Sequence, residues 1–244
     1  AKIIDYLRHA RILNKPGKPL EEKEQGALEK VVILLRDRTG HDFSLYKRNT
    51  IFRRIERRMG IHQLDRIGAY VRYLQENPQE VELLFKELLI GVTSFFRDLQ
   101  AWEQLQTQAL PKILTKRSEK EGLRAWSVGC STGEEPYSLA MAFKEVLERQ
   151  KPRMNVKLQI FATDLDSDAI AKARQGFYPA NIAADLTPER LQRFFVQDGD
   201  GYRIVKEIRE MVTFATQNVI MDPPFTKLDI LVCRNLLIYL LPEL

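Results

Sequence analysis

The sequence contains few cysteines and histidines, which excludes several kinds of site. Among 244 residues there are two cysteines, Cys130 and Cys233. They are too few for a disulfide framework and lack the spacing of a zinc site, so we expect two reduced thiols in apolar, strand-like surroundings and no bound metal. All three histidines precede residue 100. Chemistry in the later part of the chain would therefore not use a histidine base.

The sequence also lacks any long apolar run. A helix that crosses a membrane needs roughly 20 apolar residues, and no stretch approaches that length. The opening AKIIDYLRHARI is too charged for a signal peptide. We therefore expect a cytoplasmic protein without membrane insertion. Because the chain opens without methionine and within a helical pattern, we also expect it to be a fragment of a longer protein.

The excess positive charge lies in one short stretch. The formal net charge is +5. Residues 47–58 carry six basic side chains against one acidic side chain, Glu56, a difference that is also +5, so the rest of the chain is neutral. This pattern indicates a local, unopposed basic patch and not a general affinity for nucleic acid or other polyanions.

Apolar periodicity divides the chain into a linker, a helical domain and a larger domain. Residues 1–26 end in NKPGKPLEEKEQG, whose prolines, glycine and alternating charges leave no apolar face. This favours a linker or the tail of a preceding domain. Residues 27–99 have a helical apolar period with interruptions, which predicts a bundle of about four short helices. Residues 100–244 make up the larger domain.

The larger domain has the pattern of an α/β fold. After a helix near residues 98–116, short apolar runs alternate with helices; these predicted strands are LRAWSV (123–128), KLQIFAT (157–163), MVTFAT (211–216) and LDILVC (228–233). Buried strands that alternate with helices predict a parallel, Rossmann-like sheet with right-handed crossovers. Residues 176–210 interrupt the alternation, and their D-G-D-G turn at 198–201 predicts a small antiparallel lobe. The sequence ends soon after the fourth strand, so we expect an incomplete sheet.

A glycine-rich turn follows the first predicted strand. It runs from Gly129 to Gly133 and leads into Glu134 and Glu135 at the start of a helix. Glycines let a backbone approach a ligand, and a helix N-terminus offers free amides. The G-x-x-x-G spacing differs from the G-x-G-x-x-G of dinucleotide sites, and two carboxylates would repel a phosphate. They suit a cationic ligand such as S-adenosylmethionine (AdoMet), which carries an ammonium and a sulfonium.

Asp164 ends the second predicted strand. A carboxylate at this place in a Rossmann-like sheet can accept hydrogen bonds from both ribose hydroxyls. The surrounding TDLDSD is also rich in residues that cap helices. We therefore predict a ribose contact for Asp164 and a helix cap for Asp166 or Ser167, with a cap at Asp164 as the alternative.

Four ordered motifs resemble one family. They are GVTSFFRD (91–98), SVGCSTGEEPYSLAM (127–141), FATDLDSDAIAKAR (161–174) and LVCRNLLIYL (231–240). From about residue 28 to the end, the chain resembles CheR-type chemotaxis receptor methyltransferases. The resemblance implies AdoMet as cofactor and S-adenosylhomocysteine as product. It also implies methyl transfer to glutamate side chains of chemotaxis receptors, by a class I methyltransferase fold behind an all-helical N-terminal domain.

The resemblance implies roles for single residues of the first two motifs. Thr93 and Arg97 would close over the methionine part of the cofactor, with Arg97 paired to its carboxylate. Gly91 stands where the family often has asparagine, so only its backbone is available for that contact. Glu135, with Glu134 as a substitute, would lie near the ammonium group of the cofactor.

Further implied roles concern the nucleoside and the transfer site. Asp164 would hold the ribose, and Asn218 and Val219 would border the adenine. Gly129 of the glycine turn would also belong to the cofactor-binding site. Arg234 and Asn235 would line the transfer site. Tyr239 would pack near the sulfonium, although its LLIYLL surroundings also suit a core residue.

The basic patch belongs to a predicted helix over residues 49–59. Its apolar stripe consists of Ile51, Ile55 and Met59, and the arginines that share another face are Arg54, Arg57 and Arg58. Such clusters are commonly solvated surface. The resemblance implies instead that these arginines grip the acidic, helical methylation region of a receptor.

Two other interpretations of function stay open. Residues 222–225 match the D-P-P-F signature of adenine amino-methyltransferases that act on nucleic acid, and the basic helix would suit such a substrate. In those enzymes the motif follows the fourth strand, whereas here it precedes that strand. The second alternative is a non-catalytic AdoMet-binding or receptor-docking module. The opening KIIDYLRHA and the linker also resemble the tail of a CheB-type methylesterase domain, which implies a fusion of both activities.

Overall fold

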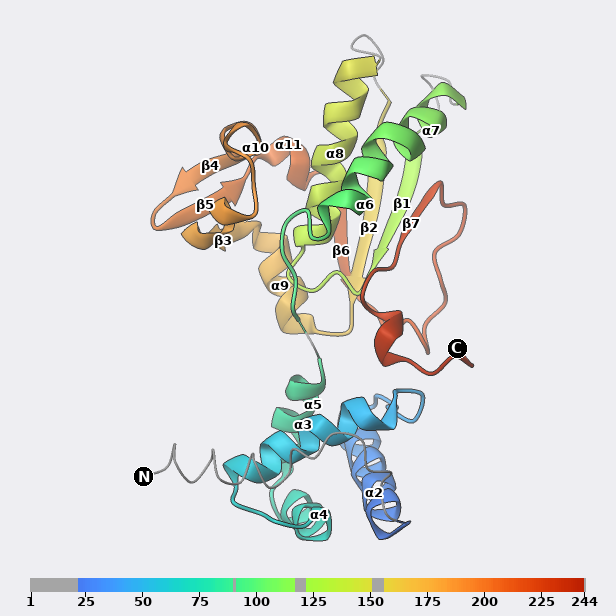
Figure 1. The fold of residues 1–244 in the computed structure, drawn as a ribbon, viewed down its shortest axis with the longest axis vertical. Coiled ribbons are helices and arrows are strands. Elements are labelled where there is room, and N and C mark those ends of the chain that lie inside the picture. The colour runs from blue at the N-terminus through green and yellow to red at the C-terminus, as the bar shows by residue number, and fades with distance from the viewer. Residues whose placement is uncertain (1–21, 90, 117–121, 151–155, 244) are drawn as a thin grey trace. The chain divides into compact units, whose positions relative to one another are not determined.

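The computed structural model describes residues 22–89, 91–116, 122–150 and 156–243 (Figure 1). The chain divides into two compact units, of which one comprises residues 1–90 with 237–244 and the other comprises residues 91–236. The division therefore falls between residues 90 and 91, and not between 99 and 100, because the segment 91–98 makes its contacts within the second unit.

The first unit contains a bundle of four helices in its described residues, as predicted. They are α2 (Glu22–Thr39), α3 (Arg48–Ile61), α4 (Ile67–Glu76) and α5 (Pro78–Leu88). Each contributes fully buried apolar side chains to the core of the unit, among them Val31, Ile55, Tyr70 and Leu84. Pro78 separates α4 from α5 because proline has no amide hydrogen to continue a helix but fits its first turn. Helix α2 begins inside the segment predicted as a linker, whose residues 1–21 lie outside the described residues.

The C-terminal segment of the first unit packs on the loop before α3. It forms a 3₁₀ turn, η3 (Leu237–Tyr239). The backbone amide of Lys47 donates to the carbonyl of Tyr239 (2.9 Å), and its Nζ donates to the carbonyl of Ile238 (2.8 Å). These bonds explain why residues 237–244 cluster with the helices and not with the strand that precedes them.

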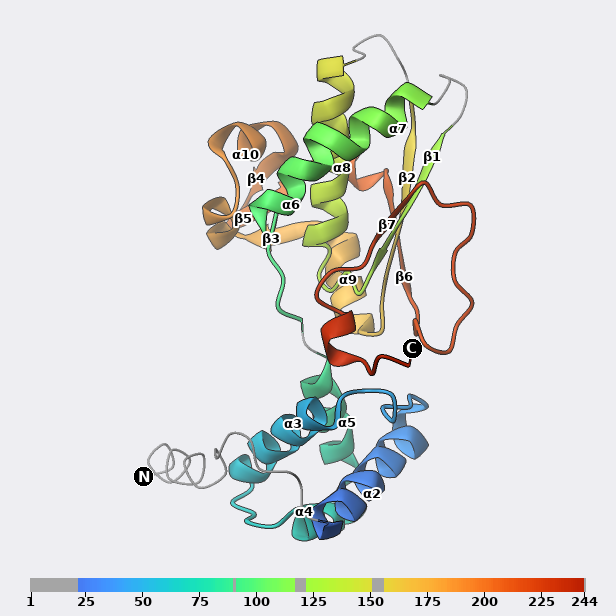
Figure 2. The same cartoon turned by 45° about the vertical axis from the view of Figure 1, so that its right-hand side comes forward.

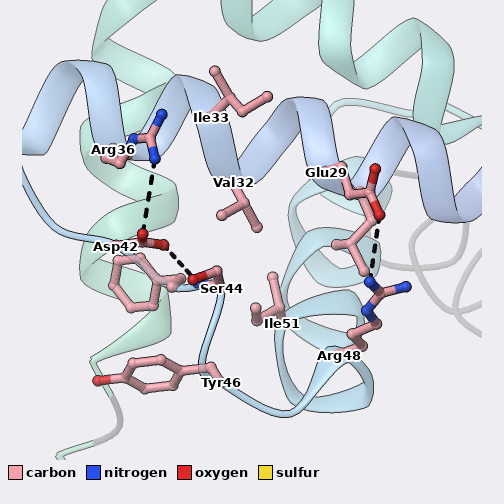
Figure 3. A pocket seen from close by; sticks show the side chains of 11 residues that line it. Glu29, Val32, Ile33, Arg36, Asp42, Ser44, Tyr46, Arg48 and Ile51 are labelled. Atoms are coloured by element: carbon pink, nitrogen blue, oxygen red, sulfur yellow. Dashed lines mark hydrogen bonds and ion pairs between the residues drawn. The ribbon is translucent and has the colours of Figure 1, made fainter. Parts of the chain in front are cut away.

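A hollow of about 330 Å³ lies between α2, the loop before α3 and α3 itself (Figure 3). Two ion pairs cross its rim. Arg48 Nη2 lies 3.3 Å from Glu29 Oε1, and Arg36 Nη1 lies 3.9 Å from Asp42 Oδ2. The rim is thus electrically balanced, and Arg48 of the basic stretch already has an acidic partner.

The basic stretch on α3 is opposed by acidic residues of α5, so the expectation of an unopposed patch is wrong. Arg57 Nη1 lies 2.7 Å from Glu87 Oε1, and Arg54 Nη1 lies 3.6 Å from the same oxygen. Arg58 forms two hydrogen bonds with Glu80 (2.8 and 2.6 Å), and its side chain is only 13% exposed. A charge count along the sequence does not show which acidic residues fold back against the stretch.

Glu80 is the centre of a buried polar cluster. Besides Arg58, its carboxylate accepts a hydrogen bond from the hydroxyl of Tyr70 (2.8 Å) and lies 2.9 Å from Nε2 of His62. Burial by itself raises the pKa of the Glu80 carboxyl, but the hydrogen bonds from Arg58, Tyr70 and His62 outweigh burial and hold the pKa below its usual 4.5. The ionised form of Glu80 therefore stabilises the folded unit.

The second unit is built on a parallel sheet, as predicted. In the described residues its strands are β1 (Leu123–Val128), β2 (Leu158–Asp164), β6 (Val212–Thr216) and β7 (Ile230–Val232), in the spatial order β6-β2-β1-β7. Ala125 in β1 pairs with Ile160 in β2 on one side and with Ile230 in β7 on the other. The chain therefore moves outward from β1 in both directions, as in Rossmann-like sheets.

Helices pack against this sheet (Figures 1 and 2). They are α8 (Glu134–Gln150) after β1, α9 (Ser167–Gln175) after β2, and a continuous run before β1 that consists of α6 (Leu99–Gln104), the π-helical turn η1 (Leu105–Ala109) and α7 (Leu110–Lys116). Side chains of α8 and of the central strands belong to one buried core, with Phe143 and Ile160 at most 1% exposed. Within the described part of the chain, no helix is both long and apolar enough to span a bilayer.

The predicted insert is a small antiparallel lobe beside the sheet (Figure 1). It contains β3 (Phe177–Pro179), η2 (Ala180–Ala184), α10 (Pro188–Phe194), β4 (Phe195–Asp198), β5 (Gly201–Ile204) and α11 (Lys206–Arg209). The strands run in the order β3-β5-β4, and β4 and β5 form the predicted hairpin. A side chain at Gly201 would overlap the carbonyl oxygen of Tyr178, so glycine permits the pairing of β5 with β3.

Replacing Glu80 with glutamine should destabilise the first unit by about 3–5 kcal/mol, because Arg58 would keep a nearly buried charge without its counter-charge. Glu82→Gln on the same helix is the matched control, since its partner Arg38 is 50% exposed and such surface pairs contribute about 0–1 kcal/mol. Urea unfolding followed by circular dichroism measures the free energy of unfolding of both variants.

The loss of stability in Glu80→Gln should depend on pH, because the pKa of Glu80 is lowered in the folded state. The loss should be complete above pH 4.5 and decline as the pH falls through the lowered pKa of the folded protein. Equal effects of the two substitutions would contradict a buried cluster.

Candidate functional site

Most of the predicted site residues gather at one edge of the parallel sheet. The loops that follow parallel strands all leave at the carboxyl edge, and open α/β sheets bind ligands in the crevice where the strand order diverges. Here that crevice lies outside β1 and β7, which are neighbours in the sheet. Gly129, Asp164, Asn218 and Arg234 all lie at or just beyond the ends of strands on this edge.

The glycine turn after β1 folds tightly against the end of β2. The amides of Gly129 and Cys130 both donate to the carbonyl of Thr163 (2.8 and 3.0 Å). Gly129 (φ +68°) and Gly133 (φ +96°) have backbone conformations that side chains rarely adopt. A Cβ on Gly133 would lie 2.9 Å from the Cβ of Ala173, so glycine lets α9 pack against the turn.

The segment 91–98 runs beside this turn. A Cβ on Gly91 would lie 3.2 Å from Oγ of Ser131, which places the start of the segment next to the glycine motif. The GVTSFFRD and SVGCSTGEE motifs, separate in the sequence, thus meet at the carboxyl edge.

Asp164 joins the ends of two loops. The amide of Ser131 donates to Oδ2 (2.7 Å), and the amide of Asp166 donates to Oδ1 (2.9 Å). Burial raises the pKa of the Asp164 carboxyl, and these two hydrogen bonds offset the effect only in part. Asp166 caps α9 by accepting from the amides of Asp168 and Ala169, which confirms the predicted cap.

The two glutamates that open α8 have different partners. Glu135 accepts a hydrogen bond from Oγ of Ser127 (2.9 Å) and lies 3.7 Å from Nη1 of Arg234. Glu134 accepts a hydrogen bond from Oγ1 of Thr132 instead. Burial raises the pKa of both carboxyls, although Ser127 and Arg234 counteract it at Glu135, and Thr132 counteracts it at Glu134. Glu135 is the one that contacts another predicted site residue.

Arg234 connects the loop after β7 to the segment 91–98. Its Nη2 donates both to the carbonyl of Arg97 and to Oδ2 of Asp98, each at 2.6 Å. Its guanidinium also lies 5.5 Å from the centre of the Trp102 ring, within the range of a cation–π contact. One arginine thus holds together elements that are far apart in the sequence.

Arg97 folds back on its own segment. Its Nη1 donates to the carbonyl of Val92 (2.8 Å), and its charge helps to lower the pKa that burial raises at Glu135. Thr93 is half-buried within the loop that this hydrogen bond closes. The structure therefore brings the charge of Arg97 within reach of Glu135, and Thr93 belongs to the same loop as Arg97.

Sequence reasoning missed three contacts of this site. Asp98 pairs with Arg234, Ser127 binds Glu135, and Nε1 of Trp102 donates to the carbonyl of Arg97 (2.9 Å). Asp98 and Ser127 both lie inside the motifs of the family resemblance, so the sequence could have marked them as candidate site residues. Trp102 is a core residue, since it is 4% exposed, and its ring also faces Arg234.

Asn218 and Val219 lie in a tight turn after β6. Residue Gln217 starts this turn with a hydrogen bond from its amide to the carbonyl of Asp164 (3.0 Å). The amide of Asn218 donates to Oδ2 of Asp222 (2.7 Å), and Val219 is 39% exposed. The turn is therefore anchored to the strand end that carries Asp164.

Five predicted residues are not gathered into this cluster of contacts. Asn235 follows Arg234 and is exposed, with a left-handed backbone (φ +58°) that asparagine tolerates. Tyr239 and the arginines of α3, namely Arg54, Arg57 and Arg58, belong to the first unit. Their expected roles beside cofactor or substrate stay predictions.

The D-P-P-F motif lies in the loop between β6 and β7, as its position in the sequence predicts. The ring of Phe225 stacks on Phe161 of β2, with centroids 4.6 Å apart, and meets Trp126 of β1 edge-on at 5.4 Å. The Phe225 side chain therefore packs on the sheet. The motif precedes strand β7, whereas in a nucleic-acid amino-methyltransferase it would follow that strand.

The two cysteines and the acidic residues do not form a metal site in the described residues. Cys130 is buried and Cys233 is half-buried, and both are free thiols as predicted. No group of three His, Cys, Asp or Glu side chains in that part of the chain lies close enough together to hold a metal ion.

The carboxylates at the carboxyl edge favour a cationic ligand. Burial raises the pKa of Glu134, Glu135 and Asp164 because a negative charge is poorly stabilised away from water. A positive ligand would stabilise their ionised forms, whereas a phosphate would add like charge. The glycine turn lets the backbone approach a ligand closely. These residues therefore fit a nucleoside that carries an ammonium and a sulfonium.

Comparison with protein families finds the same combination of parts. Residues 91–244 match the model described as CheR methyltransferase, SAM binding domain. Residues 26–89 match the model described as CheR methyltransferase, all-alpha domain. SAM is S-adenosylmethionine, the kind of cationic nucleoside that the carboxylates at the carboxyl edge fit.

Similar proteins agree with this assignment. The chain is 33% identical over 204 residues to the chemotaxis protein methyltransferase of Listeria monocytogenes, a match that covers 84% of this chain and 75% of the relative. It is 32% identical over 218 residues to that of Escherichia coli, with 84% and 71% covered. It is 42% identical over 217 residues, 89% of its length, to an uncharacterized 104.1 kDa protein of Rhodobacter capsulatus, of which it spans only 23%. The chain therefore belongs to the CheR methyltransferase family, with S-adenosylmethionine as its cofactor.

Proposed function

We propose that this chain transfers the methyl group of AdoMet to glutamate side-chain carboxylates of chemotaxis receptors, which gives glutamate methyl esters. The observation that carries the proposal is a pair of half-buried carboxylates, Glu135 at the start of α8 and Asp164 at the end of β2, whose pKa values are raised by burial. The relatives named chemotaxis protein methyltransferase support the choice of receptor. When bound, AdoMet supplies a methyl group activated by its sulfonium.

Five residues take the cofactor-binding roles in this proposal. Glu135 binds the ammonium group, and Asp164 accepts hydrogen bonds from the ribose hydroxyls. Asp164 can do so while it keeps its two backbone hydrogen bonds, because an ionised carboxylate has about four acceptor sites. Arg97 exchanges its bond to the carbonyl of Val92 for the carboxylate of the methionine part. Asn218 and Val219 border the adenine.

The transfer step requires alignment and no general base. A glutamate side chain is already ionised at neutral pH, so the protein has to hold the acceptor oxygen in line with the methyl group and sulfur. Arg234 and Asn235 line this position, and Tyr239 packs near the sulfonium. Asp98 and Trp102 keep the guanidinium of Arg234 in place.

The arginines of α3 provide the contact with the receptor. Arg54 and Arg57 share the single carboxylate of Glu87, which leaves net positive charge at a surface where Arg57 is 54% exposed. Such a surface attracts an acidic helix and orients it. Arg58 contributes less to this surface, because Glu80 already neutralises it inside the bundle.

The two alternatives have weaker support. A nucleic-acid substrate would require the D-P-P-F motif at the end of β7, and its Phe225 instead packs on Phe161. A non-catalytic module would bind the cofactor but transfer no methyl group. Each alternative gives a different result in the same assay.

Incubation of the protein with labelled AdoMet and the cytoplasmic fragment of a receptor should give base-labile label on the receptor and none on RNA. Methyl esters of glutamate hydrolyse in base, whereas N-methyl groups on adenine do not. A receptor fragment with alanine at its methylation glutamates is the control and should stay unlabelled. Label on RNA would support the nucleic-acid function, and binding of S-adenosylhomocysteine without any label would support the non-catalytic module.

Replacing Glu135 with glutamine should weaken the binding of S-adenosylhomocysteine about 10–100-fold, because a hydrogen bond to a charged group contributes about 1.5–3 kcal/mol. Glu134→Gln is the matched control, since Glu134 bonds to Thr132 and not to Arg234. Its effect should be small. Titration calorimetry measures both dissociation constants, and equal losses would contradict the separate roles of the two glutamates.

The same substitution should remove a pH dependence of cofactor binding. Because burial raises the pKa of Glu135, the affinity of the unsubstituted protein should be highest above that raised value and fall as the pH drops through it. The ammonium group of the ligand favours the carboxylate, so binding in this pH range should release protons. Calorimetry in buffers of different ionisation enthalpy measures the release, which should be smaller in Glu135→Gln.

Replacing Arg57 with glutamine should slow receptor methylation several-fold at low salt and leave the binding of S-adenosylhomocysteine unchanged. The loss should shrink as salt is added, because exposed charges are screened within about 10 Å at 0.1 M salt. Arg38→Gln is the control, since Arg38 is similarly exposed and paired (50% against 54%) but belongs to α2. A salt-independent loss, or the same loss in Arg38→Gln, would count against an electrostatic receptor contact at α3.

A further inference from the structure

The segment 95–98 holds two residues in an unfavourable backbone conformation. Phe96 has φ +50° and Asp98 has φ +59°, which is the left-handed region that bulky side chains rarely occupy. Such residues persist only where their surroundings fix them, and they often occur at functional sites. Between these two residues stands Arg97, the residue that closes over the cofactor in the proposed function. What fixes Phe96 and Asp98 therefore also fixes Arg97.

Hydrogen bonds within the methyltransferase core hold this segment, and one of them joins Arg234 to the Asp98 carboxylate (2.6 Å). The amide of Phe96 donates to Oγ of Ser138 on α8 (3.0 Å). The carbonyl of Arg97 accepts from Trp102 and from Arg234 (2.9 and 2.6 Å). These contacts fix the backbone on either side of Arg97, but none of them supports the Phe96 ring from the lobe side.

The inserted lobe contacts this segment as well. The ring of Phe95 meets Tyr178 and Phe195 of the lobe edge-on (centroids 4.9 and 5.3 Å apart). Arg190 on α10 lies directly over the ring of Phe96, with its guanidinium carbon 3.7 Å from the ring centre. Its Nε and Nη2 bond to the two oxygens of Glu145 on α8 (2.8 and 2.9 Å), and both side chains are less than one-fifth exposed, at 17% and 16%. Gln106, in the π-helical turn, donates to the same carboxylate (2.6 Å). The two hydrogen bonds to Glu145 therefore hold the guanidinium of Arg190 over the Phe96 ring.

From these contacts we infer that Arg190 is a positioning residue, through which the inserted lobe holds Arg97 in its cofactor-binding place. The inference rests on the proposed role of Arg97. A guanidinium over an aromatic face is attractive and, when largely removed from water, is among the stronger contacts of this kind. Phe96 is 1% exposed, so the pair is shielded from solvent. The lobe therefore does more than attach to α8, because it completes the enclosure of a strained segment at the cofactor site.

The space around Arg190 makes its contribution hard to replace. A cavity of about 450 Å³ lies next to it, lined by residues that include Trp102, Gln106 and Glu145. If the guanidinium were removed, the face of the Phe96 ring that it covers would lose its partner, and only the edge-on contact with Trp102 (ring centres 5.4 Å apart) would remain of these two ring contacts. The left-handed conformation at Phe96 would then lose a contact that offsets its strain.

A neighbouring arginine provides a matched control. Arg193 lies on the same short helix and pairs with Glu148 of α8, one turn along from Glu145. Its guanidinium covers Phe194 and not Phe96. If arginines of α10 merely attach the lobe to α8, Arg190 and Arg193 should have similar effects. If Arg190 acts through Phe96, only its replacement should disturb the segment 92–98.

Hydrogen exchange and cofactor binding test the inference together. In Arg190→Met, amides of a peptide that spans residues 92–99 should exchange at least several-fold faster, while the lobe strands at 195–204 keep their protection. The dissociation constant for S-adenosylhomocysteine should rise by about tenfold, since apparent affinity falls with the fraction of protein in the competent conformation. In the methylation assay KM for AdoMet should rise and KM for the receptor should stay the same. Arg193→Met should change none of these quantities.

Arg190→Lys separates the ring contact from the ion pair. Lysine keeps a charge for Glu145 but lacks the flat guanidinium that stacks on a ring, so its dissociation constant should lie nearer to that of Arg190→Met than to that of the unsubstituted protein. This variant also decides the question if Arg190→Met does not fold. Unchanged exchange at 92–99 in the Arg190 variants, or equal effects of the Arg190 and Arg193 variants, would overturn the inference. Failure of the unsubstituted protein to bind S-adenosylhomocysteine would instead overturn the proposed function on which it rests.

Discussion

The Asp164 carboxylate is the interaction on which the rest of the cofactor site depends. It ends β2 and accepts amide hydrogen bonds from the glycine turn on one side and from the start of α9 on the other. The turn after β6 is joined to the same residue through its backbone carbonyl. Three loops at the carboxyl edge are therefore fixed by one residue. Because its oxygens retain acceptor capacity, the group that shapes the site is also available to a ligand.

Two glutamates largely shielded from water show how the partners of a carboxylate decide its role. Glu80 and Glu135 are both shielded from water, yet the pKa of Glu80 is lowered and that of Glu135 is raised. Glu80 has a bidentate arginine and a tyrosine as donors. Glu135 has one serine hydroxyl and an arginine at 3.7 Å that is shared with Asp98. The first carboxylate is satisfied and structural, whereas the second has unused capacity for a positive charge.

The sequence predicts most of the fold because both of its periodic patterns are strong. Apolar spacing predicts the helices of the first unit, and alternation of buried strands with helices predicts the parallel sheet and its inserted lobe. Boundaries are less certain from sequence, since helix α2 extends into a charged stretch that looks like a linker. The grouping of residues 237–244 with the helical unit was also not predictable, because it depends on hydrogen bonds from Lys47, far away in the chain.

The contacts between the predicted site residues could not be predicted from the sequence. Motifs and strand ends identify Arg97, Glu135, Asp164 and Arg234, because glycine turns and strand termini leave local signals. They do not reveal that Arg234 pairs with Asp98 across 136 positions of sequence, nor that Glu80 and Glu87 neutralise much of the α3 charge. A charged side chain that is fully paired within the fold stabilises the structure, whereas one with free hydrogen-bonding positions is available to a ligand. The sequence supplies the charged residues, and the fold determines which of them are structural and which can bind a ligand.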